Sequence, residues 1–200
     1  DVLAQLDAVA NHSHTSDYRF HAAAQRVLAE LRDAHTRYHP PRVYQTLVFV
    51  QPFRLLHVFD SAAGAQQVYV SPFVYDALAP FWAGRLPRAL RDFSGARVLA
   101  IDGEPAFDHV ARFANTTVGL CKDVGTRINI AFASPQPVQP AARRLAQSRD
   151  LAFFGGQFSV RDPLLLPVPA RAAVHYKMVL ADGTALSFAA DWAVVPLANY

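Results

Sequence analysis

Within the segment Leu31 to Pro41, the groups suited to proton transfer near neutral pH are the imidazoles of His35 and its neighbour His39. His35 lies two residues after Asp33 and one before Thr36. An imidazole titrates close to neutral pH, so a histidine with a carboxylate beside it can act as a general base. A histidine near the C-terminus of a helix can equally be structural, because its positive charge interacts favourably with the helix macrodipole. The residues alone leave both interpretations of His35 open.

The element expected to position His35 is an amphipathic helix over about Tyr18 to Ala34. Ser16 and Asp17 can cap its first turn. The prolines that follow, Pro40-Pro41, forbid its continuation and leave His35 in the turn between the helix and the next strand. The apolar residues of this helix recur at three- and four-residue spacing, which places them on one face: Phe20, Ala24, Val27, Leu28 and Leu31. A shorter helix is predicted before it from Val2, Leu3, Leu6, Val9 and Ala10.

The histidines are concentrated near the start of the chain, which raises the question of a zinc site. Zinc needs three or four ligands that converge on one point, and no HExxH motif or similar pair fixes such a geometry. The only cysteine, Cys121, excludes an intrachain disulfide and any CxxC motif. We therefore expect neither a metal nor a cofactor. The histidines of the first 39 residues are His12, His14, His21, His35 and His39.

Composition favours a folded chain of mixed structure. With 52% hydrophobic residues in 200, the chain can bury a sizeable core, and its 14 prolines favour a turn-rich fold over a helical bundle. The net charge is only +3, and no cluster of arginine and lysine is interleaved with aromatic residues, so nucleic acid is not an expected partner. No apolar run is long enough to span a membrane.

Two features favour a secreted or extracellular protein. Asn11-His12-Ser13 and Asn115-Thr116-Thr117 fit the N-glycosylation sequon, which makes Asn11 and Asn115 candidate glycosylation sites. The sequence also begins at Asp1 without a methionine, which suggests a processed product whose targeting segment has been removed.

After the prolines the pattern becomes that of strands and turns. An aromatic group at 73–82 could line a peptide groove or pack in the core, and 134–140 is proline-rich and predicted to be an exposed loop. Strands are expected at 43–50, 53–59 and 67–70, with a turn at 60–64 between the last two, and at 97–101. An Asp102-Gly103 turn, a helix from Glu104-Pro105 to about Asn115, and a hairpin of 173–180 with 184–192 complete the expected elements.

Three segments, in their order and spacing, resemble the S41 or C-terminal-processing family of serine peptidases, in the branch similar to chlamydial protease-like activity factor and its fungal relatives. Leu31-Arg32-Asp33-Ala34-His35-Thr36-Arg37-Tyr38 resembles the family's L-x-D-x-H segment. Residues 98–106, VLAIDGEPA, resemble the V-x-x-I-(D/N)-G-x-x-A strand and turn of its PDZ-like domain. The last hairpin, with Tyr176, Asp182-Gly183 and Trp192, resembles the Y-x-(F/V)-x-D-G … W run before the catalytic core.

This resemblance implies an α+β fold in two parts. Residues 1–60 would form an N-terminal helical segment with the Asp-Ala-His motif and the first strands. Residues 61–200 would form a PDZ-like β-rich domain with inserted loops that ends in a hairpin. His35 would be the general base for a serine located downstream, with Asp33 or Thr36 orienting it. In the bacterial processing-peptidase branch the base is a lysine, and the equivalent histidine is structural.

The sequence departs from the family in one respect. It has no GxSxG and no Ser-Ala-Gly-Ser-like segment, and neither Lys122 nor Lys177 lies in the context of a catalytic dyad. The expected function is therefore the substrate-binding and histidine-supplying N-terminal portion of a secreted S41-like serine endopeptidase, inactive alone. The serine would lie on a C-terminal half of the same precursor, and a protein or peptide substrate would add as a strand to the PDZ-like sheet.

The main alternative is a non-catalytic secreted protein-binding module or effector that keeps the same scaffold. A small-molecule or lipid carrier is a third hypothesis, and it is suggested only by the 14 phenylalanines.

Overall fold

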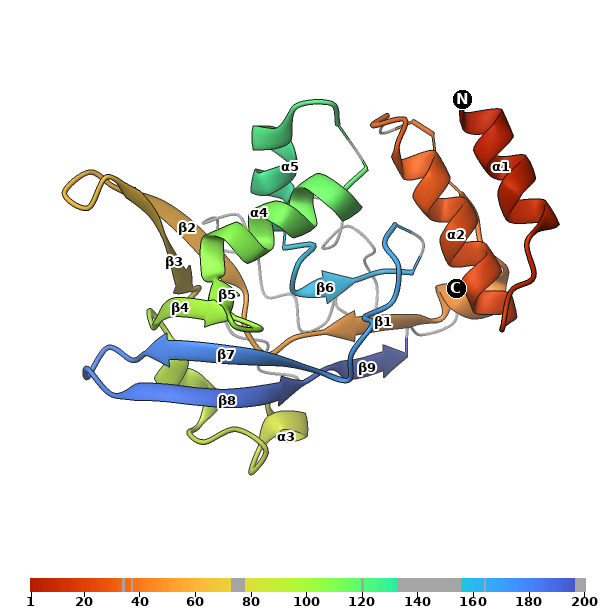
Figure 1. The fold of residues 1–200 in the computed structure, drawn as a ribbon. Helices are drawn as coiled ribbons and strands as arrows, with labels where there is room; N and C mark the ends of the chain where they lie inside the picture. Colours follow the sequence, from red (N-terminus) through yellow and green to blue (C-terminus); the bar gives the residue numbers. More distant parts are fainter. Residues whose placement is uncertain are drawn as a thin grey trace.

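The structure, a computed structural model, describes residues 1–33, 35–36, 38–72, 78–119, 121–132, 156–163 and 165–196. Helices and two antiparallel sheets are combined in it, as Figure 1 shows. The predicted α+β class is confirmed. The aromatic residues Phe73 and Tyr75 and the expected loop at 134–140 lie outside the described residues.

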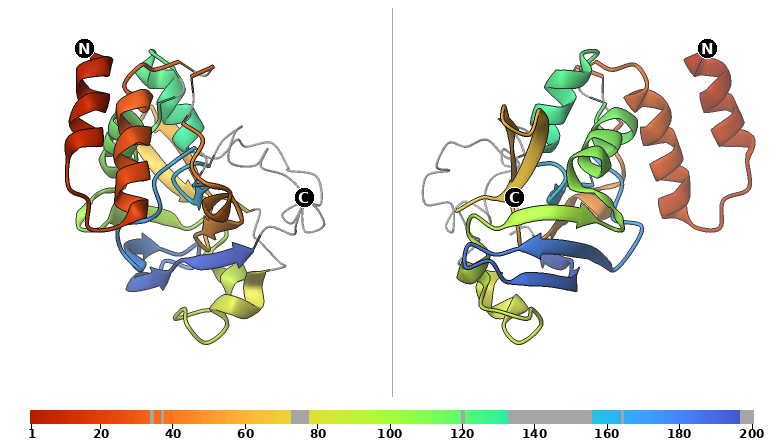
Figure 2. Two further views of the ribbon diagram at one scale, coloured as in Figure 1. Left: turned by 90° about the vertical axis from the view of Figure 1, so that its right-hand side faces the viewer. Right: turned by 60° about the vertical axis from the view of Figure 1, so that its left-hand side comes forward.

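Two helices open the chain and lie side by side in all three views (Figures 1 and 2). They are α1 (Val2–Asn11) and α2 (Asp17–Ala29), and both were predicted. The side chain of Asp1 caps α1 by accepting a hydrogen bond from Leu3 N, and that of Ser16 caps α2 by accepting one from Arg19 N.

Helix α2 is shorter than the sequence pattern suggested. It ends at Ala29 because the next hydrogen bonds, from Glu30 N and Leu31 N, go to carbonyls three residues back. Arg32 then takes a left-handed conformation with φ of 54°, which turns the chain out of the helix. His35 consequently lies further beyond the helix than expected, in the connection to the following 3₁₀ helix, η1 (Arg42–Gln45).

The larger sheet has six strands, and both predicted hairpins are part of it (Figure 1). Its spatial order is β2 (Leu55–Asp60), β3 (Ala65–Val70), β4 (Arg97–Ile101), β7 (Ala173–Val179) and β8 (Ala185–Asp191), with β5 (Glu104–Pro105) beside the end of β4. The expected boundary between 60 and 61 falls in the turn between β2 and β3, which pair from Leu55↔Val70 to Asp60↔Ala65.

A smaller sheet joins distant parts of the chain. Its order is β6 (Val160–Arg161), β1 (Leu47–Val50) and β9 (Ala193–Pro196). β6 and β9 were not predicted, because strands of two and four residues have almost no periodicity of their own. The strand expected over 43–50 was too long, since Pro41 precedes the 3₁₀ turn η1 and β1 begins only at Leu47.

The Asp102-Gly103 turn is confirmed, with left-handed φ angles of 50° and 86°. The helix that follows, α4 (Ala106–Thr117), begins later than expected because Glu104 and Pro105 pair with β4 instead of starting the helix. Helix α5 (Val124–Ala131) was not among the predicted elements, because Ile128, Ile130 and Phe132 alternate and lack a helical spacing. Asp123 caps α5 by accepting from Thr126 N. Of the short elements, α3 is Ala79–Trp82 and η3 is Leu90–Phe93.

Aromatic rings fill the core between the large sheet and its covering segments. Phe53 lies 4.8 Å from Phe93 and 5.3 Å from Tyr176, measured between ring centroids. Trp82, the last member of the predicted aromatic group, is 2% exposed and belongs to this core. None of the helices in the described ranges is long and apolar enough to cross a bilayer.

Candidate functional site

His35 and Asp33 form a hydrogen-bonded pair in the connection after α2. Nδ1 of His35 lies 3.3 Å from Oδ1 of Asp33, and the backbone N–H of His35 donates to the same oxygen at 3.0 Å. The hydroxyl of Thr36 donates to Oδ2 of Asp33 at 2.9 Å. The side chain of His35 is 96% exposed, and that of Asp33 is 47% exposed. The structure therefore brings together the three residues that the sequence motif singled out.

The carboxylate of this pair is held in its ionised form. The backbone N–H of His35 and then the Thr36 hydroxyl lower the pKa of Asp33 below its ordinary value of 3.8. At neutral pH, Nδ1 of the His35 ring consequently faces a full negative charge.

The same geometry leaves the second ring nitrogen available. Because Asp33 occupies the Nδ1 side, Nε2 is the atom of His35 that can accept a proton from another group. No residue in the described part of the chain hydrogen-bonds to Nε2. A base oriented by a carboxylate can activate a hydroxyl placed within about 2.6–3.2 Å of its free nitrogen. The geometry of Asp33 and His35 is compatible with a carboxylate that orients a base.

A second hydrogen-bonded group fastens the segment that carries His35. The Tyr38 hydroxyl is hydrogen-bonded to Nδ1 of His21, on the second turn of α2. Nε2 of His21 lies 3.3 Å from Oδ2 of Asp17, which also accepts from the Tyr44 hydroxyl at 2.9 Å. Burial and then the nearby Asp17 raise the pKa of Tyr38, so its phenol stays protonated and serves as a structural partner.

The sequence analysis missed this clamp of His21, Tyr38 and Asp17. One part of it was visible, because Asp17 and His21 are four residues apart and therefore on one face of α2. The contact with Tyr38 was not, since it joins residues 17 positions apart across a chain reversal.

The C-terminal end of α2 is fixed by a close approach to the loop after α4. The side chain of Arg32 donates to the Val118 carbonyl at 3.4 Å. A Cβ built on Gly119 would lie 2.7 Å from the Cβ of Ala29, so only glycine fits there without a shift. One turn earlier, on the same face of α2, the amide of Gln25 donates to the Pro163 carbonyl at 3.1 Å. The helix that precedes His35 is therefore held by two contacts with other parts of the chain.

The predicted glycosylation sites both lie on helices and are exposed. Asn11 is at the end of α1, where its amide nitrogen donates to the Asp7 carbonyl at 2.9 Å. Asn115 is in the last turns of α4, and its oxygen accepts from Arg127 at 2.7 Å. Within the described ranges, no three metal-binding side chains come together. Of the early histidines, His21 lies in α2, and the other four lie in the connections between elements.

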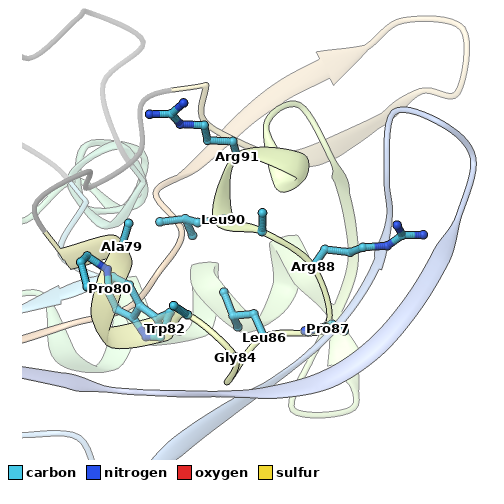
Figure 3. Close-up of a pocket in the computed structure, with 11 residues that line it drawn as sticks. Ala79, Pro80, Trp82, Gly84, Leu86, Pro87, Arg88, Leu90 and Arg91 are labelled. Carbon is cyan, nitrogen blue, oxygen red and sulfur yellow. The ribbon is translucent and has the colours of Figure 1, made fainter.

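An apolar pocket of about 760 Å³ lies apart from His35, between α3 and η3. Trp82, Leu86 and Leu90 lie around it in Figure 3, and the side chains of Arg88 and Arg91 extend away from them on opposite sides. The indole nitrogen of Trp82 donates to the Asp191 carbonyl at 3.0 Å, which ties the pocket to the end of β8. A pocket of this composition suits an apolar side chain.

Comparison with known proteins gives a likeness in structure and none in sequence. No protein-family model matches the chain, and no curated protein matches it in sequence. The crystal structure of a serine-to-alanine mutant of CPAF (chlamydial protease-like activity factor), a serine protease, matches with a TM-score of 0.50 and 15% identity. The match covers 97% of this chain and 28% of that one. The chain shares its fold with part of CPAF.

A second solved structure gives a similar comparison. Mature CPAF matches with a TM-score of 0.48 and 15% identity, again over 97% of this chain and 28% of that chain. This protein therefore spans less than a third of the CPAF chains that it resembles. At such low identity the likeness concerns the fold.

Proposed function

We propose that this chain is the N-terminal, substrate-binding and histidine-supplying portion of a secreted S41-like serine endopeptidase. His35 is the general base, and Asp33 orients its ring. The serine nucleophile comes from polypeptide outside these 200 residues, so the chain alone does not hydrolyse peptides. Asn11 and Asn115 are the sites at which a secreted form would carry glycans.

The observation that carries this proposal is the state of the His35 ring. Here the side chain is 96% exposed, one nitrogen faces an ionised carboxylate, and the other faces outward with no partner in the described part of the chain. Such an arrangement suits a general base whose accessible nitrogen accepts a proton from a hydroxyl on another segment.

The substrate-binding part of the proposal rests on the larger sheet. β2 is an edge strand, and its Val58 and Phe59 are 55% and 60% exposed. An edge strand offers unpaired main-chain groups, to which an extended peptide can add as a further strand. Helix α4 packs on β3 and β4, as a helix does in a PDZ-like domain, and we assign the PDZ-like role to this unit.

The proposal is tested by recombining the chain with the C-terminal half of its precursor. Hydrolysis of fluorescein-labelled casein is expected only in the combined sample, and His35→Ala should abolish it. His39→Ala is the matched control, because His39 is also exposed and lies in the same segment. Full activity of the His35→Ala sample, or equal loss with both variants, would contradict the assigned role.

A second candidate function is a non-catalytic protein-binding module, and the apolar pocket between α3 and η3 favours it. In that case neither the chain nor the combined sample would hydrolyse casein. Binding to a partner protein would persist in His35→Ala and would be weakened by Leu90→Asp, which places a charge in the apolar pocket.

A further inference from the structure

Arg161 is a buried cation that pairs with no carboxylate in the described part of the chain. It lies on β6, and the residue is only 9% exposed. Its Nε donates to the Phe158 carbonyl at 3.1 Å, and its guanidinium carbon lies 3.7 Å from the centroid of the Phe113 ring. Among the described residues, no aspartate or glutamate is within ion-pair distance of it. Burial lowers the pKa of Arg161, yet the guanidinium remains charged at neutral pH.

This arginine lines a pocket of about 300 Å³. The walls include the rings of Phe158 and Trp192 and the backbone region of Pro169. The pocket lies between the turn before α4, strand β6 and the segment that leads into β7. It is separate from the apolar pocket between α3 and η3, and it does not include His35 or Asp33.

The charges at the rim are already paired with each other, in contrast to Arg161. Arg112 donates to Glu104 at 2.7 Å, and Arg171 lies 3.9 Å from Asp102. His109 also lines the pocket, and burial, followed by the nearby Arg112, lowers its pKa. It is therefore neutral at pH 7. With three arginines against two carboxylates, the lining keeps one positive charge in excess, and it resides on the buried arginine.

We propose that this pocket binds a carboxylate group, as carried by an acidic side chain or a chain terminus of a peptide, with Arg161 as its ion-pair partner. A guanidinium presents parallel N–H donors that match the two oxygens of a carboxylate. Here Nε is already used by the Phe158 carbonyl, so the two terminal nitrogens are the donors for the ligand. Stacking on Phe113 holds the guanidinium plane in place before the ligand arrives.

The rim selects a singly charged anion over a phosphate. Asp102 and Glu104 line the pocket, and their charges are balanced by Arg171 and Arg112. One carboxylate neutralises the single excess charge of the pocket, whereas a phosphate with nearly two charges would exceed it. The small volume and the aromatic walls further favour a group attached to a short apolar stem. This inference does not depend on His35 being a general base.

Trp192 provides the readout, because it lines the pocket and is one of two tryptophans in the chain. The experiment uses the full chain with Trp82→Phe, so that only Trp192 emits. The probes are N-acetyl-glutamate amide for an acidic side chain and N-acetyl-alanine for a chain terminus. N-acetyl-glutamine amide and N-acetyl-alanine amide are the uncharged controls, and inorganic phosphate tests the class of anion.

A saturable change in Trp192 emission is expected with at least one carboxylate probe, with affinity at least tenfold above its uncharged control and above phosphate. The probe that binds better identifies the source of the carboxylate. Arg161→Met should remove the binding, and Arg161→Lys should weaken it at least fivefold because the paired donors are lost. Arg171→Gln, at an exposed rim position, should leave the fold unchanged and weaken the binding two- to threefold.

Arg88→Gln is the matched control, because Arg88 is exposed and lines the other pocket. Equal affinity for charged and uncharged probes would overturn the proposal, as would unchanged carboxylate binding in Arg161→Lys and Arg171→Gln. If Arg161→Met does not fold, these two variants still decide the outcome. Absence of any emission change up to about 50 mM probe, where even a binding free energy of only about −2 kcal/mol would give half-saturation, would also overturn it.

Discussion

The Tyr38 hydroxyl is hydrogen-bonded to Nδ1 of His21, so the segment that carries His35 is tied back onto the helix from which it emerged. At the other end of the segment, Asp33 accepts hydrogen bonds from the backbone N–H of His35 and from the hydroxyl of Thr36. The exposed imidazole thus lies between two fixed points. This placement gives a freely accessible ring a defined position, which a general base requires.

Removing the clamp should loosen the segment without unfolding the protein. Tyr38→Phe keeps the ring and deletes only the hydroxyl, so we expect the free energy of unfolding to fall by about 0.5–1.5 kcal/mol. Amide hydrogen exchange at residues 33–38 should accelerate more than exchange in α2. Tyr44→Phe, which deletes an exposed hydroxyl that also reaches Asp17, is the control and should leave exchange of the segment unchanged. Equal exchange in both variants would show that Tyr38 does not hold the segment.

The contact of α2 with the loop after α4 should tolerate no side chain at position 119. Gly119→Ala would place its Cβ 2.7 Å from that of Ala29, and we expect a loss of about 1–3 kcal/mol in unfolding free energy. Gly125→Ala is the matched control, because Gly125 lies within α5, where alanine has the higher helix propensity. Chemical denaturation measures both. A stability of Gly119→Ala equal to that of Gly125→Ala would contradict the close approach.

The turn at Asp33 should open in acid. Because its pKa is lowered in the folded protein, Asp33 stabilises the turn above its ordinary value of 3.8, and this stabilisation is lost as the pH falls through the lower, folded value. The Asp33 carboxyl carbon, followed by NMR, should titrate below pH 3.8 in the wild type. Thr36→Val removes one of the hydrogen bonds and should move the midpoint upward. A midpoint at the ordinary value in both proteins would be inconsistent with the observed contacts.

Much of this structure could be predicted from local sequence, and the exceptions share a physical cause. The pairing of Asp33 with His35 was predictable because the two residues are separated by one position. The end of α2 was not, since it depends on the left-handed conformation of Arg32 and on the packing of Ala29 against Gly119. Tertiary contacts of this kind override helix propensity.

The most distant contacts were also the least predictable. Strands β6 and β9 exist only through their pairing with β1, from opposite sides of that strand. The cation of Arg161 meets the ring of Phe113 from another element, so nothing near Arg161 in the sequence marks it as buried. For the same reason, the pocket that it lines had no motif that a sequence analysis could find.

Orientation by Asp33 is the second element of the proposed catalytic role. In the precursor that carries the serine, Asp33→Asn should lower kcat by about 10²- to 10⁴-fold, because the amide neither stabilises the protonated ring nor fixes its tautomer. The value of KM should change much less, since Asp33 is not placed to contact substrate. Thr36→Val, which keeps the carboxylate, should lower kcat less than tenfold. A rise in KM with kcat unchanged would instead point to a role of Asp33 in substrate binding.

The most direct test of His35 as the base is chemical rescue of the precursor that lacks its ring. The His35→Ala precursor should hydrolyse casein at less than about one-thousandth of the wild-type rate. Free imidazole should restore part of that rate in proportion to its concentration. The same imidazole should leave a His39→Ala precursor unaffected. A His35→Ala precursor with wild-type activity would contradict the central claim, as would an inactive one whose rate imidazole fails to raise.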